Sequence, residues 1–103
     1  MATRQRRVVW TDQAQQMLDE AVAYRARDSR PAAERLLIQA LDAAASLDAF
    51  SERGRIVPEL NQPNVRELLV QRYRLLYEVT PSDVHILAFI RGARDLTRLQ
   101  LEG

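Results

Sequence analysis

The chain has 103 residues, of which 47% are hydrophobic and 28% charged; this composition fits one folded domain and excludes an intrinsically disordered chain. It has no cysteine and one histidine, His85, which excludes disulfide frameworks, thiol nucleophiles and zinc sites built from cysteine or several histidines. The net charge is +1, every basic residue is arginine, and no apolar run approaches the ~20 residues of a membrane helix. We therefore expect one domain over residues 1–103, in the cytoplasm, with no membrane contact, cofactor or metal.

The N-terminal part of the sequence predicts a strand followed by a helix. Residues 6–10, "RRVVW", form a short β-branched and aromatic run, and Trp10 is expected in the core. Thr11 follows as a helix N-cap. Apolar residues then recur at three- and four-residue spacing, which predicts an amphipathic helix as far as about Arg27. The residues of this stripe are Ala14, Met17, Leu18, Ala21 and Val22.

A second helix is expected after a short break at residues 28–34, "DSRPAAE". Pro31 suits the first turn of a helix, and either Ser29 or Arg30 would cap it. A second stripe of alanine and leucine continues to Leu47. Because the break is short, the two helices are predicted to lie antiparallel as a hairpin.

The C-terminal half predicts a loop and then an antiparallel meander. Residues 48–64 form the loop, in which "IVPEL" is a candidate short strand with Pro58 at an edge or bulge. Strands follow at residues 65–70, 73–79 and 84–90. The tight turns near Gln71-Arg72 and at "TPSD" make these strands antiparallel neighbours. The fold class is therefore α+β, with the helix hairpin on one face of a three- to four-stranded antiparallel sheet.

Alternation along residues 72–79 assigns the two faces of this sheet. Tyr73 and Tyr77 share the face expected to pack against the helices, whereas Arg74 points to the other, partly open face. Arg66 on the neighbouring strand can approach Arg74 if the register allows. A concave cluster on the open face could then contain Arg55, Glu59, Arg66, Arg74, Arg91 and Arg94.

Arginines beside a carboxylate could cleave RNA. Glu59 would take the proton of the 2′-hydroxyl, and the guanidinium groups would stabilise the charge that develops on the phosphorane. A general acid is harder to find, because His85 lies in mid-strand, away from the cluster. The alternative is structural: Arg72 and Glu78 would form surface ion pairs, Glu59 would be a loop residue, and His85 would be a packed or solvent-facing strand residue.

The chain resembles toxins of the RelE/ParE superfamily of type II toxin–antitoxin systems. Four stretches carry the resemblance: "VVWTDQAQQMLDE", "RPAAERLLIQALDA", "GRIVPELNQPNVRELLVQRYRLLYEV" and "VHILAFIRGARDL". It implies the α+β fold described above and a small cognate antitoxin as partner, with operator DNA bound only through the antitoxin. RelE-like and YoeB-like members cut messenger RNA in the ribosomal A site, and ParE-like members poison DNA gyrase.

The resemblance implies candidate roles for single residues. Glu59, Arg66, Arg74 and Arg94 match catalytic positions of the nucleases, with Glu59 as the base. Arg91 stands where the nucleases often have a histidine, and the C-terminal "DLTRLQLEG" has no tyrosine or histidine. This favours a gyrase inhibitor, in which Arg55, Arg72 and Arg91 bind the target. A ribosome-dependent endoribonuclease and a degenerate, interaction-only module are the alternatives.

Overall fold

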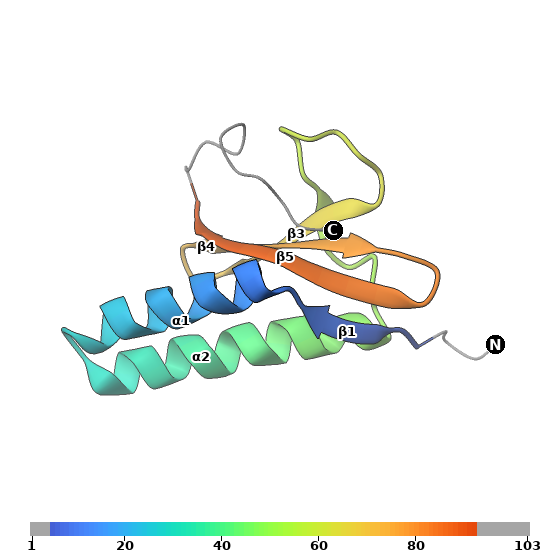
Figure 1. Cartoon of the computed structure of the whole chain (residues 1–103). Coiled ribbons are helices and arrows are strands. Elements are labelled where there is room, and N and C mark those ends of the chain that lie inside the picture. Colours follow the sequence, from blue (N-terminus) through green and yellow to red (C-terminus); the bar gives the residue numbers. More distant parts are fainter. Residues whose placement is uncertain (1–4, 93–103) are drawn as a thin grey trace.

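The computed structural model describes residues 5–92, which form two α-helices and one five-stranded sheet (Figure 1). In chain order the elements are β1 (Arg7–Trp10), α1 (Asp12–Ala26), α2 (Arg30–Ala45), the short 3-10 helix η1 (Ser46–Asp48), β2 (Arg55–Ile56), β3 (Val65–Val70), β4 (Tyr73–Val79) and β5 (Asp83–Arg91). The predicted α+β class and order of elements are confirmed. Neither helix of this part of the chain has the length and hydrophobicity of a membrane span.

Both helices begin at a side-chain cap. The hydroxyl of Thr11 accepts a hydrogen bond from the Ala14 N–H at 3.1 Å and donates one to the Ile86 carbonyl at 2.9 Å, which ties the start of α1 to β5. Ser29, not Arg30, caps α2, because its hydroxyl accepts from the Ala32 N–H at 3.2 Å. Each cap satisfies a backbone donor that the first helical turn leaves unpaired.

The strands follow the order β1-β5-β4-β3-β2. The predicted meander is present, since β4 pairs antiparallel with both β3 and β5. The sheet is wider than the three or four strands expected. The two-residue β2 extends one edge and ends before Pro58, while β1 joins the other edge parallel to β5. The helix hairpin is the crossover that a parallel connection requires.

The turn between β3 and β4 determines which side chains share a face. Gln71 and Arg72 are its only residues, and Gln71 adopts a positive φ of 55°. Leu69 therefore lies opposite Arg74, and Arg66 lies opposite Tyr77. Because side chains alternate across the sheet, Glu67 and Leu69 share the face of Arg74, whereas Arg66 points to the opposite face.

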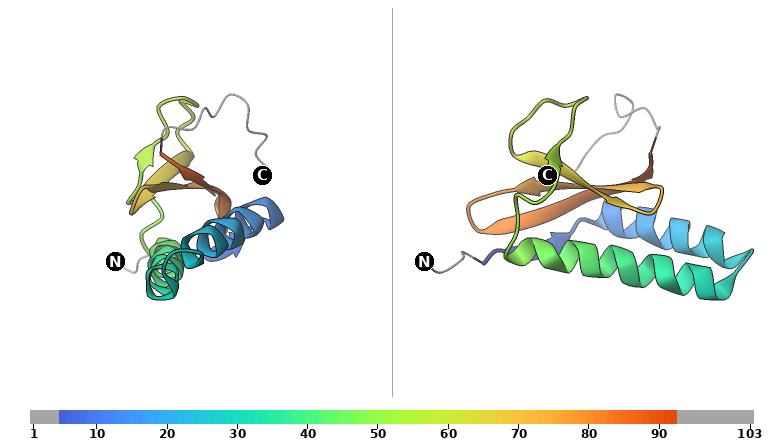
Figure 2. Two further views of the ribbon diagram at one scale, coloured as in Figure 1. Left: turned by 90° about the vertical axis from the view of Figure 1, so that its left-hand side faces the viewer. Right: turned by 180° about the vertical axis from the view of Figure 1, so that it is seen from behind.

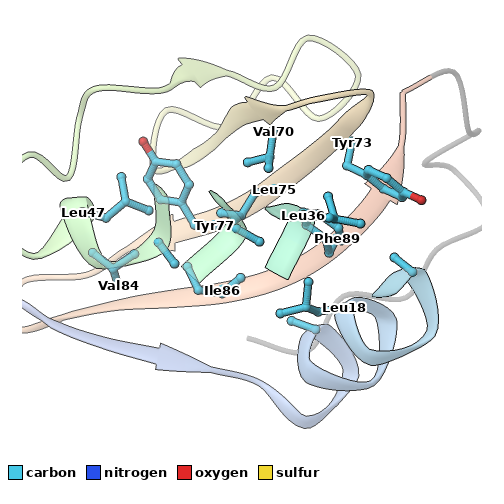
Figure 3. Packing of buried hydrophobic residues seen from close by; sticks show 14 residues of the cluster. Leu18, Leu36, Leu47, Val70, Tyr73, Leu75, Tyr77, Val84, Ile86 and Phe89 are labelled. Atoms are coloured by element: carbon cyan, nitrogen blue, oxygen red, sulfur yellow. The ribbon is translucent and has the colours of Figure 1, made fainter. Parts of the chain in front are cut away.

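The two helices lie side by side on one face of the sheet (Figure 2). The main core fills the space between the helices and the sheet. Leu18 and Leu36 of the helices pack with Tyr77, Phe89 and other buried side chains of the sheet (Figure 3). Tyr73 stacks on Phe89 with ring centroids 4.7 Å apart. The prediction that both tyrosines belong to the core is confirmed; Trp10 is partly buried against this core.

The second face, predicted to be partly open, is exposed at Leu69 but is more covered than the sequence indicated. A second apolar cluster lies there, made of Val57, Val65, Leu76, Leu87, Ala88 and Ile90. Two features build it. The register shift between Leu76 and Tyr77 interrupts the pairing of β4 with β5 beside Leu87, and the segment after β2 folds back so that Val57 is fully buried and Leu60 packs on the cluster.

Candidate functional site

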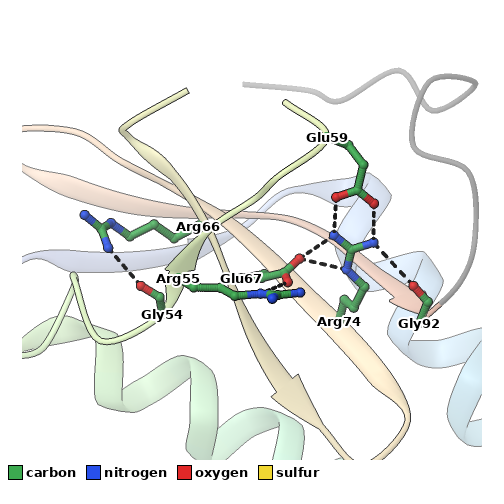
Figure 4. Close-up of polar contacts among 7 residues, drawn as sticks. All are labelled: Gly54, Arg55, Glu59, Arg66, Glu67, Arg74 and Gly92. Atoms are coloured by element: carbon green, nitrogen blue, oxygen red, sulfur yellow. Dashed lines mark hydrogen bonds and ion pairs between the residues drawn. The ribbon is translucent and has the colours of Figure 1, made fainter. Parts of the chain in front are cut away.

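Arg74 occupies the second face beside this apolar cluster, and only 7% of its side chain is exposed. Its Nη1 and Nη2 donate to the two carboxylate oxygens of Glu59 at 2.7 and 2.8 Å, and its Nε donates to Oε1 of Glu67 at 2.7 Å (Figure 4). The bond to Glu59 is the bidentate fork that guanidinium and carboxylate form best. Arg74 is therefore fully engaged by two acids.

Glu67 is the buried centre of this group, with 1% of its side chain exposed. Its second oxygen accepts from Nε of Arg55 at 2.5 Å, and 66% of the Arg55 side chain faces solvent. We call Arg55, Glu59, Glu67 and Arg74 the Arg74 cluster. It holds two guanidinium groups and two carboxylates, so that it has no surplus positive charge with which to hold a phosphate.

The ion pairs shift the protonation equilibria strongly. Hydrogen bonds from Arg74 lower the pKa of Glu59 to about 2, and the bond to Glu59 raises the pKa of Arg74 further above its usual range. Glu59 is thus a carboxylate at any physiological pH, with both oxygens occupied. A general base works best when its pKa lies near the operating pH, so this environment makes Glu59 a weak base.

Arg66 does not join the Arg74 cluster, although the sequence analysis named it as a candidate member if the strand register allowed. Its Nη1 donates to the carbonyl oxygen of Gly54 at 2.9 Å, on the helix-facing side of the sheet (Figure 4). The reason is the two-residue turn at Gln71 and Arg72, which sets Arg66 out of phase with Arg74 by one position. The structure therefore separates two of the candidate catalytic arginines.

Arg72 and Arg91 come together elsewhere, at the end of the β4–β5 ladder. Arg91 pairs with Tyr73, and the Gly92 N–H donates to the carbonyl of Arg72 at 3.0 Å. Both arginines are exposed. They do not enter the Arg74 cluster, and the candidate Arg94 lies outside the described residues.

His85 is far from Arg74. It pairs with Glu78, four residues further along β4, which is about 13 Å at ~3.3 Å per strand residue. Its Nδ1 is buried without a hydrogen-bond partner and lies 3.8 Å from a Glu78 oxygen. The ion pair expected between Arg72 and Glu78 is absent; Glu78 instead accepts from Asn64 at 3.3 Å.

Sequence reasoning missed Glu67, the more deeply buried of the two acids bonded to Arg74. The signal was present, because a two-residue turn at Gln71 and Arg72 pairs Leu69 with Arg74 and so brings Glu67 diagonally beside it. Among residues 5–92, no three acidic, histidine or cysteine side chains gather in a way that could hold a metal ion.

Comparisons with known proteins agree with this fold. The family model of the ParE toxin of the type II toxin-antitoxin system parDE matches residues 8–96. Among solved structures, the chain is similar to the chromosomal ParDE TA system from P. aeruginosa, with a TM-score of 0.71 and 20% sequence identity over 85% of this chain and 97% of that chain. A comparison with curated proteins gives no match. Since the family model matches most of the chain, the chain belongs to the ParE toxin family of type II toxin–antitoxin systems.

Proposed function

We propose that this chain is the toxin of a toxin–antitoxin pair, that it stops growth by acting on DNA gyrase in the cytoplasm, and that a cognate antitoxin neutralises it. The observation that carries the choice of gyrase is the closed state of the Arg74 cluster. Arg74 and Glu59, the arginine and the base that a nuclease would use, are bonded to each other through both oxygens of the carboxylate.

Cleavage of RNA would require this pair to separate. Arg74 would have to leave Glu59 to bind a phosphate, and Glu59, with its pKa lowered to about 2, would have to accept a proton. His85, the single histidine of the chain, is about 13 Å away by strand spacing and does not supply a general acid. These features favour an inhibitor that binds its target over a ribosome-dependent endoribonuclease.

The surface of the molecule supports an antitoxin partner. Ile38 and Leu41, one helical turn apart on α2, are both exposed. Exposed apolar side chains of this size are typical of protein interaction surfaces when they lie close together. An antitoxin that covers them would account for their exposure, and operator DNA would be reached only through that antitoxin.

The first experiment is pulse labelling after induction of the chain in a host without antitoxin, with DNA and protein synthesis followed in parallel. A gyrase inhibitor stops DNA synthesis first and leaves cleaved DNA, whereas protein synthesis continues at the start. Protein synthesis that stops first would contradict the gyrase proposal and favour the endoribonuclease. If neither synthesis slows, the chain is an interaction-only module.

A single variant separates the two mechanisms. Glu59→Gln removes the candidate base but keeps an oxygen that can accept from Arg74, and the side chain is 39% exposed, so that the fold tolerates the change. We expect Glu59→Gln to remain as toxic as the parent chain. Arg35→Gln, an exposed change on α2, is the matched surface control. Toxicity lost in Glu59→Gln alone would support RNA cleavage.

A further inference from the structure

A cleft of about 650 Å³ lies between the C-terminal end of α1 and the turn that joins β3 to β4. Gln71 of that turn connects both helices. Its Oε1 accepts from Nη2 of Arg25 at 3.2 Å, and its Nε2 donates to Oε1 of Gln39 on α2 at 3.0 Å. Hydrogen bonds therefore join the β3–β4 turn, which forms one wall of the cleft, to α1, which forms the other, and to α2.

The cleft concentrates positive charge. Among residues 5–92, Arg25, Arg72 and Arg91 line it against one acid, Asp28. We call these four residues the arginine cleft. None of the three arginines forms an ion pair with a carboxylate in the described part of the chain. The contrast with the Arg74 cluster is direct, because there each guanidinium is neutralised by an acid. Three arginines that have no carboxylate partner thus lie together at this cleft, which gives it a local positive charge.

A mainly apolar hollow of about 290 Å³, whose rim includes Glu20, continues the arginine cleft toward Met17 and Phe89. Tyr24, Tyr73 and Arg91 line both spaces, so they form one site with a charged half and an apolar half. Tyr24 is 58% exposed, and the guanidinium carbon of Arg27 lies 5.7 Å from the centroid of its ring. Its exposure leaves aromatic surface open to a ligand.

We propose that the arginine cleft binds a single strand of nucleic acid. Guanidinium groups of Arg72, Arg91 and Arg25 hold phosphates, and a base stacks on Tyr24 over the apolar hollow. Asp28 accepts a hydrogen bond from an exocyclic amino group of that base. The inference deepens the proposed action on gyrase, on which it rests, by naming DNA of the gyrase–DNA complex as a direct contact of the toxin.

The composition of the site selects this ligand over an acidic peptide. Phosphate, a flat aromatic surface and an amino donor occur together in a nucleotide, and the site offers a partner for each. An acidic peptide segment would use the arginines but has no base to stack on Tyr24 and no exocyclic amino group to donate to Asp28. The site is also separate from the Arg74 cluster, because the two share no residue and the cleft is lined by Tyr24 and Arg25 of α1, which covers the face of the sheet opposite Arg74 (Figure 2).

Binding is tested on the full chain with a fluorescein-labelled single-stranded oligodeoxynucleotide of about twelve nucleotides, by fluorescence anisotropy. Three arginine–phosphate contacts predict that the logarithm of the affinity falls with the logarithm of the salt concentration with a slope of about −2. Arg72→Gln/Arg91→Gln should flatten the slope to about −0.7 and weaken binding by roughly tenfold or more for each arginine.

Arg7→Gln/Arg35→Gln is the matched control, since it removes the same charge from exposed positions on β1 and α2, outside the cleft. It should keep the slope of the parent chain. An equal loss in both double variants would mean general attraction of a polyanion and would overturn the proposal. So would the absence of binding, or tighter binding of a glutamate-rich peptide at the same site.

Stacking has its own pair of variants. Tyr24→Ala should weaken binding between about fivefold and about a hundredfold, and Tyr24→Phe should restore it, because both tyrosine and phenylalanine present a ring face. No loss in Tyr24→Ala would remove the stacking part of the proposal.

A supercoiling assay with purified gyrase, run beside the binding assay, distinguishes the two proposals. Gyrase inhibition without oligonucleotide binding would overturn only the arginine cleft as a nucleic-acid site. Oligonucleotide binding without gyrase inhibition would overturn only the proposed target.

Discussion

Replacing Arg74 by methionine tests whether the Arg74 cluster is a buried charge network. In Arg74→Met the Glu67 carboxylate, with 1% of its side chain exposed, keeps only Arg55 as an ionic partner. Breaking a buried ion pair costs about 3–5 kcal/mol because the remaining charge is uncompensated. We expect the lower end, about 3 kcal/mol, since Arg55 stays. For a domain of this size that lowers the melting temperature by about 12 °C or more.

The second variant removes both buried charges. Arg74→Met/Glu67→Leu leaves apolar side chains beside Leu76 and Ile90, and Arg55 is released to solvent. Replacing a buried ion pair by packed apolar groups is often neutral or stabilising, so the double variant should regain most of the loss. This recovery distinguishes an uncompensated charge from a simple packing defect, which a further substitution would worsen.

The measurement is urea unfolding of the parent chain and both variants, made by cell-free synthesis so that toxicity does not limit the yield. The free energy of unfolding and its dependence on urea are compared at neutral pH. A loss of less than about 1 kcal/mol in Arg74→Met would refute the burial argument, because it would equal the cost of an exposed pair. A double variant as unstable as the single one would refute the role of Glu67.

Three further predictions concern the same region. The pKa of Glu59 is about 2 in the folded chain and 4.5 for the free group, so its pair with Arg74 stabilises the fold fully above pH 4.5 and is lost as the pH falls toward 2. Above pH 4.5 the parent chain should be more stable than Glu59→Gln by about 1–2 kcal/mol, a value reduced because Glu59 is partly exposed to solvent. This difference in unfolding free energy should shrink as the pH falls from 4.5 toward 2. Gly54→Ala should destabilise the chain by about 2 kcal/mol or more in urea, because the new Cβ would meet the Glu67 carbonyl and the Tyr77 hydroxyl within 3.0 Å. Tyr77→Phe should cost about 1–3 kcal/mol by thermal melting, because the Gly54 N–H, which donates to the Tyr77 hydroxyl at 2.9 Å, loses its acceptor in a buried site.

Each of these has a clear contrary result. A difference between the parent and Glu59→Gln that stays constant from pH 6 to about pH 2 would mean that the carboxylate is not coupled to folding. A Gly54→Ala chain of parental stability would mean that the segment before β2 shifts freely. A Tyr77→Phe chain with an unchanged melting temperature would mean that water replaces the phenol as acceptor.

Local patterns in the sequence were sufficient for most of the fold. Three- and four-residue spacing predicted both helices, and two-residue alternation predicted β3, β4 and β5 within a residue of their observed ends. The short turns made the meander antiparallel. The parallel pairing of β1 with β5 was not predicted, because it joins residues about 75 positions apart with no turn between them.

In the candidate site, too, local sequence patterns determined some contacts and tertiary packing determined the others. The sequence by itself determined that Arg74 lies on the face away from the helices, since alternation along a strand is a local constraint. The two-residue turn at Gln71 and Arg72 is also local and places Glu67 beside Arg74, although this position was not predicted. Only the tertiary structure decided that Glu59 folds back to neutralise Arg74, and that α1 brings Arg25 and Tyr24 to Arg72 and Arg91. Such meetings depend on how separate elements pack, and no periodicity within one element specifies them.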